Sequence, residues 1–281
     1  MKNWTQVTYE YDGSFAGFLS CVFESYVNRE EGVCFLTDEA VVTLWPTRRV
    51  ETDEAHARRV YRSIPQKISP AAADLIRRAF LTCLPEREVH MFRFLRLGYE
   101  RGGAVMRDLA DDRVAILNKA VGHLNREAHL LTGFVRFSEH QGVLLSEIEP
   151  KNRVLPLLRG HFTARYSGER FLIYDRTHHE ALVSQPGFRA IVPMDDFTPA
   201  PAGAEELEYR RLWRRFYDTI AIQGRYNPRC RMTQMPKRYW AMMTEFQEDA
   251  PAAGQMDAET PAVGLETANK QIEQKSILKS G

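Results

Sequence analysis

The sequence contains few cysteines and none in a close pair. Its four cysteines, Cys21, Cys34, Cys83 and Cys230, lie 13, 49 and 147 positions apart in a chain of 281 residues. A zinc knuckle or an iron–sulfur site needs closely spaced thiols, and a disulfide framework needs several cysteines in a short secreted chain. We therefore predict ordinary thiols in a cytoplasmic protein without a metal or other cofactor.

Long apolar runs are also lacking. No stretch approaches the ~18 residues that span a bilayer. The N-terminal "MKNWTQVTYEYDG" lacks the apolar segment of a signal peptide. The whole chain has a net charge of only +1, with 44% hydrophobic and 27% charged residues. This composition is that of a soluble globular protein with no membrane partner.

The motifs of three enzyme classes are missing. The chain has no G-x-S-x-G nucleophile elbow. The segment "GYERGG" matches neither the G-x-x-x-x-G-K-[ST] phosphate loop nor a G-x-G-x-x-G pattern after a strand. These absences argue against an α/β-hydrolase, a P-loop nucleotidase and a dinucleotide-binding fold.

The first 50 residues combine strand and helix patterns. "WTQVTYEYDG" is rich in Thr, Val and Tyr and stops at Asp-Gly, which predicts a strand and a turn. Residues 14–28 place their apolar side chains on one stripe, which predicts a helix. "AVVTLWPT", residues 40–47, predicts a second strand.

Helices dominate the region from residue 52 to residue 131. Asp53 and the pair Ser69-Pro70 are typical of helix starts. The segment 86–101 is apolar around most of its circumference, which indicates a buried central helix. A further amphipathic helix is predicted over 111–131.

The pattern changes after residue 132. Apolar and polar residues alternate on both sides of Gln141-Gly142, which predicts a β-hairpin. A short helix closed by Gly168 and two or three more strands follow. A Pro/Ala linker then leads to a helix over 204–223.

These elements predict an α+β fold. Its N-terminal half is largely helical, antiparallel hairpins follow residue 132, and a basic helix and loop come at the C-terminal end. We expect a single domain over residues 1–246. The tail, residues 247–281, has no periodicity and is expected to be disordered.

The segment from Tyr209 to Trp240 is strongly basic and aromatic. It has nine cations against one acid, a local net charge of +8, and seven aromatic residues. On a helix, Tyr209, Leu212, Trp213, Phe216, Tyr217 and Ile220 share one face, and Arg210, Arg211, Arg214 and Arg215 share the opposite one. We expect the aromatic face to pack on the core. The arginine face suits phosphate, since guanidinium is a flat, permanently charged fork.

The loop after this helix, "GRYNPRCRMTQMPKRYW", adds Arg225, Arg229, Arg231, Lys237 and Arg238. An irregular segment with cationic and aromatic residues is typical of proteins that follow a nucleic-acid backbone and stack its bases on aromatic rings. The alternative is a solvated face neutralised by acids elsewhere. Tyr239 and Trp240 belong to the candidate nucleic-acid-binding set, and either stack on bases or anchor the loop on the core. The second role is favoured.

The sequence supports catalytic residues less strongly than it supports a nucleic-acid-binding segment. His123 and Glu127 lie four apart on one helix face, where a hydrogen-bonded surface pair is favoured over a metal site. His129 lies away from both. Glu147 and Glu149 lie two apart on a predicted strand, as in some Mg²⁺ sites, but such pairs are common on exposed strands. Glu127, His129, Glu147 and Glu149 are therefore catalytic candidates only.

Five segments together resemble a bacterial family assigned to DNA metabolism or repair that carries a domain of unknown function. They are "YDGSFAGFLSCVFESY", "FLRLGYERG", "NREAHLLTGFVRFSE", "EIEPKNRVLPLLRGHFTARY" with "FLIYD", and "NPRCRMTQMPKRYW". The resemblance implies partnership with a radical-SAM DNA modification or repair protein. In some proteins the same domain is fused to a uracil-DNA-glycosylase-like domain. It implies no established catalytic residue.

Three hypotheses follow. The first is a DNA-binding accessory factor that works with a radical-SAM partner and, as the fusions imply, with a uracil-DNA-glycosylase-like protein. The second is a metal-assisted enzyme acting on damaged DNA. The third is a protein–protein scaffold without DNA contact. The first is favoured because of the +8 segment.

Overall fold

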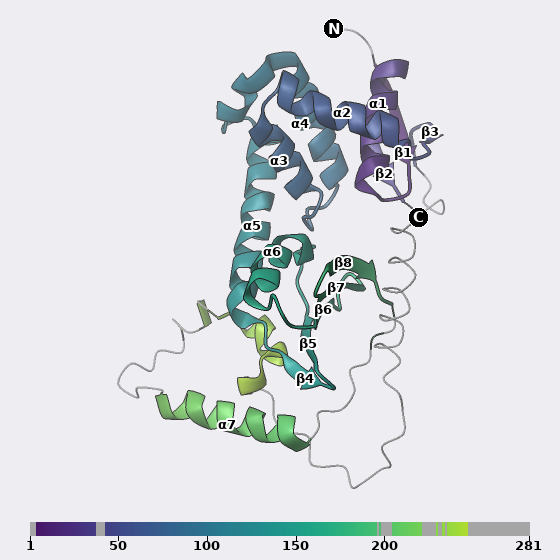
Figure 1. Ribbon diagram of the computed structural model, residues 1–281. Helices are drawn as coiled ribbons and strands as arrows, with labels where there is room; N and C mark the ends of the chain where they lie inside the picture. Colours follow the sequence, from purple (N-terminus) through teal and green to yellow (C-terminus); the bar gives the residue numbers. More distant parts are fainter. Residues whose placement is uncertain are drawn as a thin grey trace, which may run out of the picture. The chain divides into compact units, whose positions relative to one another are not determined.

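The computed structural model describes residues 4–37, 43–195, 197, 204–220, 229, 232–233 and 235–246. Helices and strands occur along most of this range, so the predicted α+β class is confirmed (Figure 1). Contacts between Cα atoms divide the chain into residues 1–125 and 126–281, here named unit 1 and unit 2. The single domain over 1–246 stays a prediction, and the predicted tail lies outside the described residues. Each unit is described by itself.

Unit 1 contains a three-stranded parallel sheet in the order β2-β1-β3. Its strands are β1 (Thr5–Glu10), β2 (Glu30–Leu36) and β3 (Thr47–Arg49). The first strand is confirmed. The strand predicted over 40–47 is wrong for residues 43–46, which form no strand, and residues 38–42 lie outside the description. Strand propensity alone misplaces this element because a strand forms only where a partner can pair with it.

Three helices of unit 1 begin at the predicted caps. They are α1 (Phe15–Asn28), α2 (Glu54–Lys67) and α3 (Pro70–Ala79). The side chains of Ser14, Asp53 and Ser69 accept hydrogen bonds from the backbone N–H groups of the first helical turns, at 2.9, 2.9 and 3.1 Å. Each bond satisfies a donor that has no partner within the helix.

Helix α4 (Arg87–Arg101) is the central helix of unit 1, as its sequence predicts. Met91, Phe92 and Phe94 are completely buried. A Cβ atom on Gly98 would lie 2.4 Å from Cδ1 of Ile68, so the glycine permits this close approach. The 3-10 helix η1 (Gly102–Arg107) and the long helix α5 (Asp112–Phe134) follow.

Unit 2 contains a five-stranded sheet in the order β4-β5-β6-β7-β8. Its strands are β4 (Ser138–His140), β5 (Val143–Ile148), β6 (Phe171–Asp175), β7 (Glu180–Gln185) and β8 (Phe188–Pro193). The predicted hairpin is confirmed: β4 and β5 pair across Gln141 and Gly142, whose φ angles of 51° and 75° suit a tight hairpin turn.

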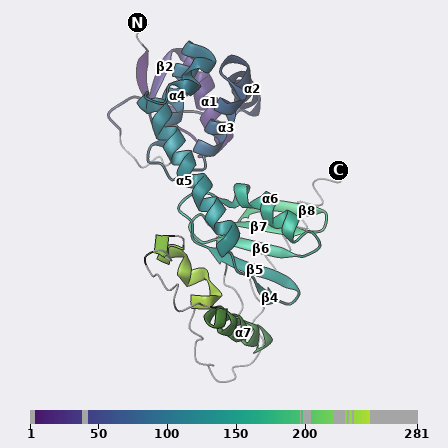
Figure 2. The same cartoon turned by 90° about the vertical axis from the view of Figure 1, so that its left-hand side faces the viewer.

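One pair of strands in this sheet is parallel. β5 and β6 run in the same direction, and α6 (Leu155–Arg165) connects them. Helix α6 packs against β7 (Figure 2). The helix ends at Arg165 with Tyr166 as its C-cap, so the prediction that Gly168 closes it is wrong. Parallel neighbours need such a crossover, which the hairpin pattern alone does not show.

The described C-terminal part of unit 2 contains α7 (Ala204–Ile220) and two 3-10 helices, η3 (Lys237–Met242) and η4 (Thr244–Phe246). Helix α7 contacts η4. In the described part of the chain, no helix is long and apolar enough to cross a membrane.

Candidate nucleic-acid interface

Helix α7 exposes the aromatic side chains that its sequence assigns to the core. Tyr209, Trp213 and Phe216 are 62%, 40% and 53% exposed. Spaced at i, i+4 and i+7, they share one helix face and are here named the aromatic ridge. Leu212 is exposed beside them. The prediction that this face packs on the core is therefore wrong for the described side chains.

A charged pair, and not the aromatic face, attaches α7 to the sheet. The Arg210 Nε atom donates to Glu206 Oε1 at 2.9 Å, and its guanidinium also donates to Ser138 Oγ on β4. The Glu206 carboxylate accepts from the Glu139 backbone N–H at 3.3 Å. Both charged side chains are half-buried. Because these bonds orient the helix, Tyr209 and Phe216 are left on the outside, while the Trp213 indole lines the inner side and donates to Glu245 Oε2 at 3.4 Å.

The other basic candidates differ in their surroundings. Arg211, Arg215 and Arg229 are exposed, and Arg214 is half-buried. Arg225 and Arg231 lie outside the described residues. Lys237 is exposed, with its amine 5.8 Å from the centre of the Trp240 ring. Exposed cations beside aromatic rings are the elements that single-stranded nucleic acid needs.

Glu127 is a buried carboxylate that holds the C-terminal segment on α5. It is 3% exposed. Its Oε1 atom lies 3.0 Å from Arg238 Nη2 and accepts from the Lys151 backbone N–H at 3.1 Å. Its Oε2 atom accepts from the backbone N–H and the side-chain amide of Asn152, at 2.9 and 2.6 Å. The predicted surface pair of His123 and Glu127 is therefore wrong.

Tyr239 and Trp240 anchor the same segment. Tyr239 is 4% exposed and packs on Phe134 with ring centres 5.4 Å apart. Burial, followed by the nearby charge of Glu127, raises the pKa of the Tyr239 hydroxyl. The Trp240 indole donates to the Met235 carbonyl at 3.0 Å, and its ring stacks on Phe246 at 4.6 Å. The anchoring role that the sequence analysis favours agrees with these contacts.

The four catalytic candidates differ in burial. Glu127 is saturated by hydrogen bonds, whereas His129 and Glu149 are exposed and Glu147 is half-buried. Within the described ranges, no group of three or more His, Cys, Asp or Glu side chains could hold a metal ion.

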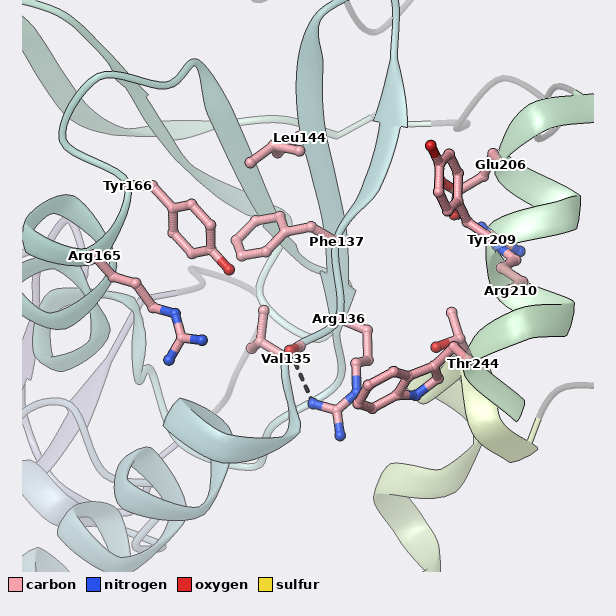
Figure 3. Close-up of a pocket in the computed structure, with 11 residues that line it drawn as sticks. Val135, Arg136, Phe137, Leu144, Arg165, Tyr166, Glu206, Tyr209, Arg210 and Thr244 are labelled. Atoms are coloured by element: carbon pink, nitrogen blue, oxygen red, sulfur yellow. Dashed lines mark hydrogen bonds and ion pairs between the residues drawn. The ribbon is translucent and has the colours of Figure 1, made fainter. Parts of the chain in front are cut away.

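A groove of about 500 Å³ lies beside α7 in unit 2. It is here named the α7 groove. Arg165 and Tyr166, at the end of α6, lie on one side, and Glu206, Tyr209 and Arg210 of α7 lie on the other (Figure 3). Arg136, Phe137 and Leu144 also line it. The groove thus collects aromatic and cationic side chains from three segments of the chain.

Two of the three arginines in the α7 groove already have carboxylate partners. Arg136 contacts both carboxylate oxygens of Glu245, at 2.7 and 3.2 Å, and the Glu245 side chain is 1% exposed. Arg210 is paired with Glu206. Arg165 is exposed. Among the described residues, its side chain interacts with the Tyr166 ring, whose centre lies 5.8 Å from the guanidinium carbon.

Residues 85–245 match the model of a domain of unknown function, DUF4130. The matched range covers more than half of the chain. The chain belongs to the DUF4130 family. No curated protein matches it significantly, and no solved structure does.

The DUF4130 match includes every described element of the interface. It runs from the residues before α4 to η4, so it contains the α7 groove, the aromatic ridge and the Glu127 cluster, which consists of Glu127, Lys151, Asn152 and Arg238. Strands β1–β3 and helices α1–α3 lie outside it. Sequence reasoning missed Arg165 and Tyr166 as site residues. The Arg-Tyr pair at the end of the "LPLLRGHFTARY" helix was the available signal.

Proposed function

We propose that this DUF4130 protein binds nucleic acid through α7, as an accessory factor in DNA metabolism or repair. The observation that carries the proposal is the exposed aromatic ridge, with Arg211 and Arg215 exposed on the same helix. Large exposed aromatic patches on a soluble protein mark interaction surfaces. Exposed arginines on the opposite face of the same helix add the positive charge that a phosphate-bearing partner requires.

The resemblance described above supports a particular setting for this activity. Family members look like partners of a radical-SAM DNA modification or repair protein, and some carry a uracil-DNA-glycosylase-like domain. An accessory factor of this kind would hold DNA while a partner performs the chemistry. The matched range contains α7, which is consistent with a role that family members share.

The test is DNA binding across a salt series. We expect a labelled oligo(dT) of about 20 nucleotides to bind the wild type at low salt and to dissociate steeply between about 50 and 200 mM salt. The Arg211→Gln/Arg215→Gln variant should bind more weakly, with a salt slope reduced by about 1.4 for two lost phosphate contacts on a single strand. Fluorescence anisotropy measures both quantities.

A matched control is available on α2. Arg58 and Arg62 are exposed and also lie four residues apart on one helix. The Arg58→Gln/Arg62→Gln variant removes the same charge and should keep the wild-type slope. No binding to single-stranded or duplex DNA at low salt, with or without the partner, would overturn the proposal. Equal losses in both variants would show a nonspecific charge effect and would also contradict it.

A further inference from the structure

The α7 groove has the size of a small ligand site. Its volume of about 500 Å³ lies within the range of roughly 300–1,000 Å³ that such sites occupy. The groove is therefore large enough for one nucleotide but not for a duplex. The ligand's chemistry follows from which side chains in the groove are already engaged.

One aromatic ring in the groove has no partner. Among the described residues, Tyr209 makes no hydrogen bond, ion pair or ring contact, and it is 62% exposed. Across the groove, Tyr166 is fixed by edge contacts with Phe137 and Phe171, with ring centres 5.0 and 6.2 Å apart (Figure 3). A ring without contacts on one side of the groove and fixed aromatic rings on the other suit a flat, apolar-faced guest such as a nucleobase.

Most of the charge in the groove is already paired. The two charges cancel within each of the ion pairs Arg136–Glu245 and Arg210–Glu206. Arg165 also lines the groove, has no carboxylate partner in the described part of the chain and is exposed at the end of α6. The groove therefore offers one unpaired positive charge, which suits a neutral base whose attached phosphate reaches the Arg165 guanidinium.

The free polar groups beside the aromatic rings are hydroxyls. Among the described residues, the hydroxyl groups of Tyr209 and Tyr166, which both line the groove, make no hydrogen bond. A tyrosine hydroxyl can donate or accept, so it can pair with either kind of group on a base edge. We expect the groove to accept any base, with stacking as the main contribution.

We propose that the α7 groove takes one unpaired nucleotide of a DNA strand, with its base between Tyr209 and Tyr166 and its phosphate on Arg165. This inference rests on the proposed function and names the substrate class of that surface. A paired base is enclosed in its duplex and cannot enter. The site therefore requires a single strand, a bulge or a base already displaced from the helix.

The test compares a fully paired DNA duplex with the same duplex carrying one bulged nucleotide. The wild type should bind the bulged duplex about tenfold more tightly, because stacking one base is worth this much or more. Tyr209→Ala and Arg165→Gln should each remove most of this preference, measured as the ratio of the two affinities in the same variant. Exchanging the bulged base among the four should alter affinity little.

Two control variants match these changes. Leu212→Ala truncates an exposed apolar residue of the same helix that lies outside the aromatic ridge and does not line the groove. Arg159→Gln removes an exposed cation of α6 that does not line it either. Both should keep the preference for the bulged duplex, and thermal unfolding should show that all four variants are folded.

The outcomes separate the two proposals. Equal affinity for both duplexes, or a preference that persists in Tyr209→Ala and Arg165→Gln, overturns the nucleotide site and leaves nucleic-acid binding by α7 intact. A preference for one base among the four overturns the stacking account. No binding to either duplex and none to oligo(dT) overturns the proposed function, and the nucleotide site with it.

Discussion

Helices α4 and α7 are built from the same kinds of residue and place them in opposite environments. In α4, Phe92 and Phe94 are completely buried, whereas in α7 Tyr209 and Phe216 are 62% and 53% exposed. Both helices carry arginines among their aromatic residues. Composition therefore does not decide whether an aromatic residue stabilises the fold or remains available for a partner.

The difference lies in what covers each helix. Helix α4 contacts β2, α2 and α3, and its arginines close over neighbouring rings. Arg96 lies 4.0 Å from the centre of the Trp4 ring, and Arg87 lies 4.5 Å from that of Phe80. Helix α7 is attached through the Glu206–Arg210 pair and through the Trp213 indole, which donates to Glu245, and Tyr209 and Phe216 stay uncovered. An aromatic residue contributes to a core only where another element packs on it.

The largest expected effect is the difference in protein stability between an aromatic-to-alanine change in α4 and one in α7. Phe94→Ala should lower the free energy of unfolding by about 3–5 kcal/mol, because it opens a cavity in the core of unit 1. Phe216→Ala should change it by less than about 0.5 kcal/mol. Urea unfolding followed by circular dichroism measures both. Comparable losses would show that α7 is covered after all.

The next largest effect is the loss of stability expected when Glu127 loses its charged partner. Arg238→Gln should cost about 2 kcal/mol, since it leaves the buried Glu127 carboxylate without its cation. Lys237→Gln, one residue earlier and exposed, should cost almost nothing. It should instead weaken DNA binding. If the two variants were equally stable, Glu127 would not be the anchor of the C-terminal segment.

A smaller effect concerns the attachment of α7. Arg210→Gln should cost about 1 kcal/mol and increase hydrogen exchange along residues 204–220, because the bonds to Glu206 and Ser138 are lost. Arg215→Gln should leave this exchange unchanged. Faster exchange in the second variant alone would contradict the assigned roles.

The smallest expected effect is the pH dependence of stability that Asp111, at the start of α5, contributes. Hydrogen bonding to Arg113 lowers the pKa of Asp111 to about 2. A carboxyl group whose pKa is lowered on folding stabilises the protein above its unfolded pKa of about 4, and this stabilisation is lost as the pH falls towards 2. Asp111→Asn should therefore make unfolding less sensitive to acid in this window. An unchanged acid profile would contradict the assignment.

Local features could be predicted from the sequence, and long-range ones could not. The caps Ser14, Asp53 and Ser69 act within a few residues, so their patterns place three helix starts correctly. Glu127 is bonded to residues 24, 25 and 111 positions further along the chain, which no local pattern reveals. The orientation of α7 depends on Ser138, 72 positions away from Arg210.

In the candidate site, too, the local features can be predicted from the sequence and the long-range contacts cannot. The basic and aromatic character of residues 209–240 can be read from the sequence, and it identifies α7 as a candidate surface. The α7 groove joins side chains from the segment before β4, from β5, from the end of α6, from α7 and from η4, so only the fold shows which residues line it. Which of its cations are neutralised depends on Glu245, a residue 109 positions from its partner Arg136.

The most direct test of the central claim is oligo(dT) binding by the variant Tyr209→Ala/Trp213→Ala/Phe216→Ala, which keeps every arginine of α7. If the aromatic ridge contacts bases, its affinity should fall by at least about tenfold, with an unchanged salt slope and an unchanged melting temperature. Wild-type affinity in this folded variant would show that the exposed aromatic residues of α7 do not bind nucleic acid, and would contradict the account.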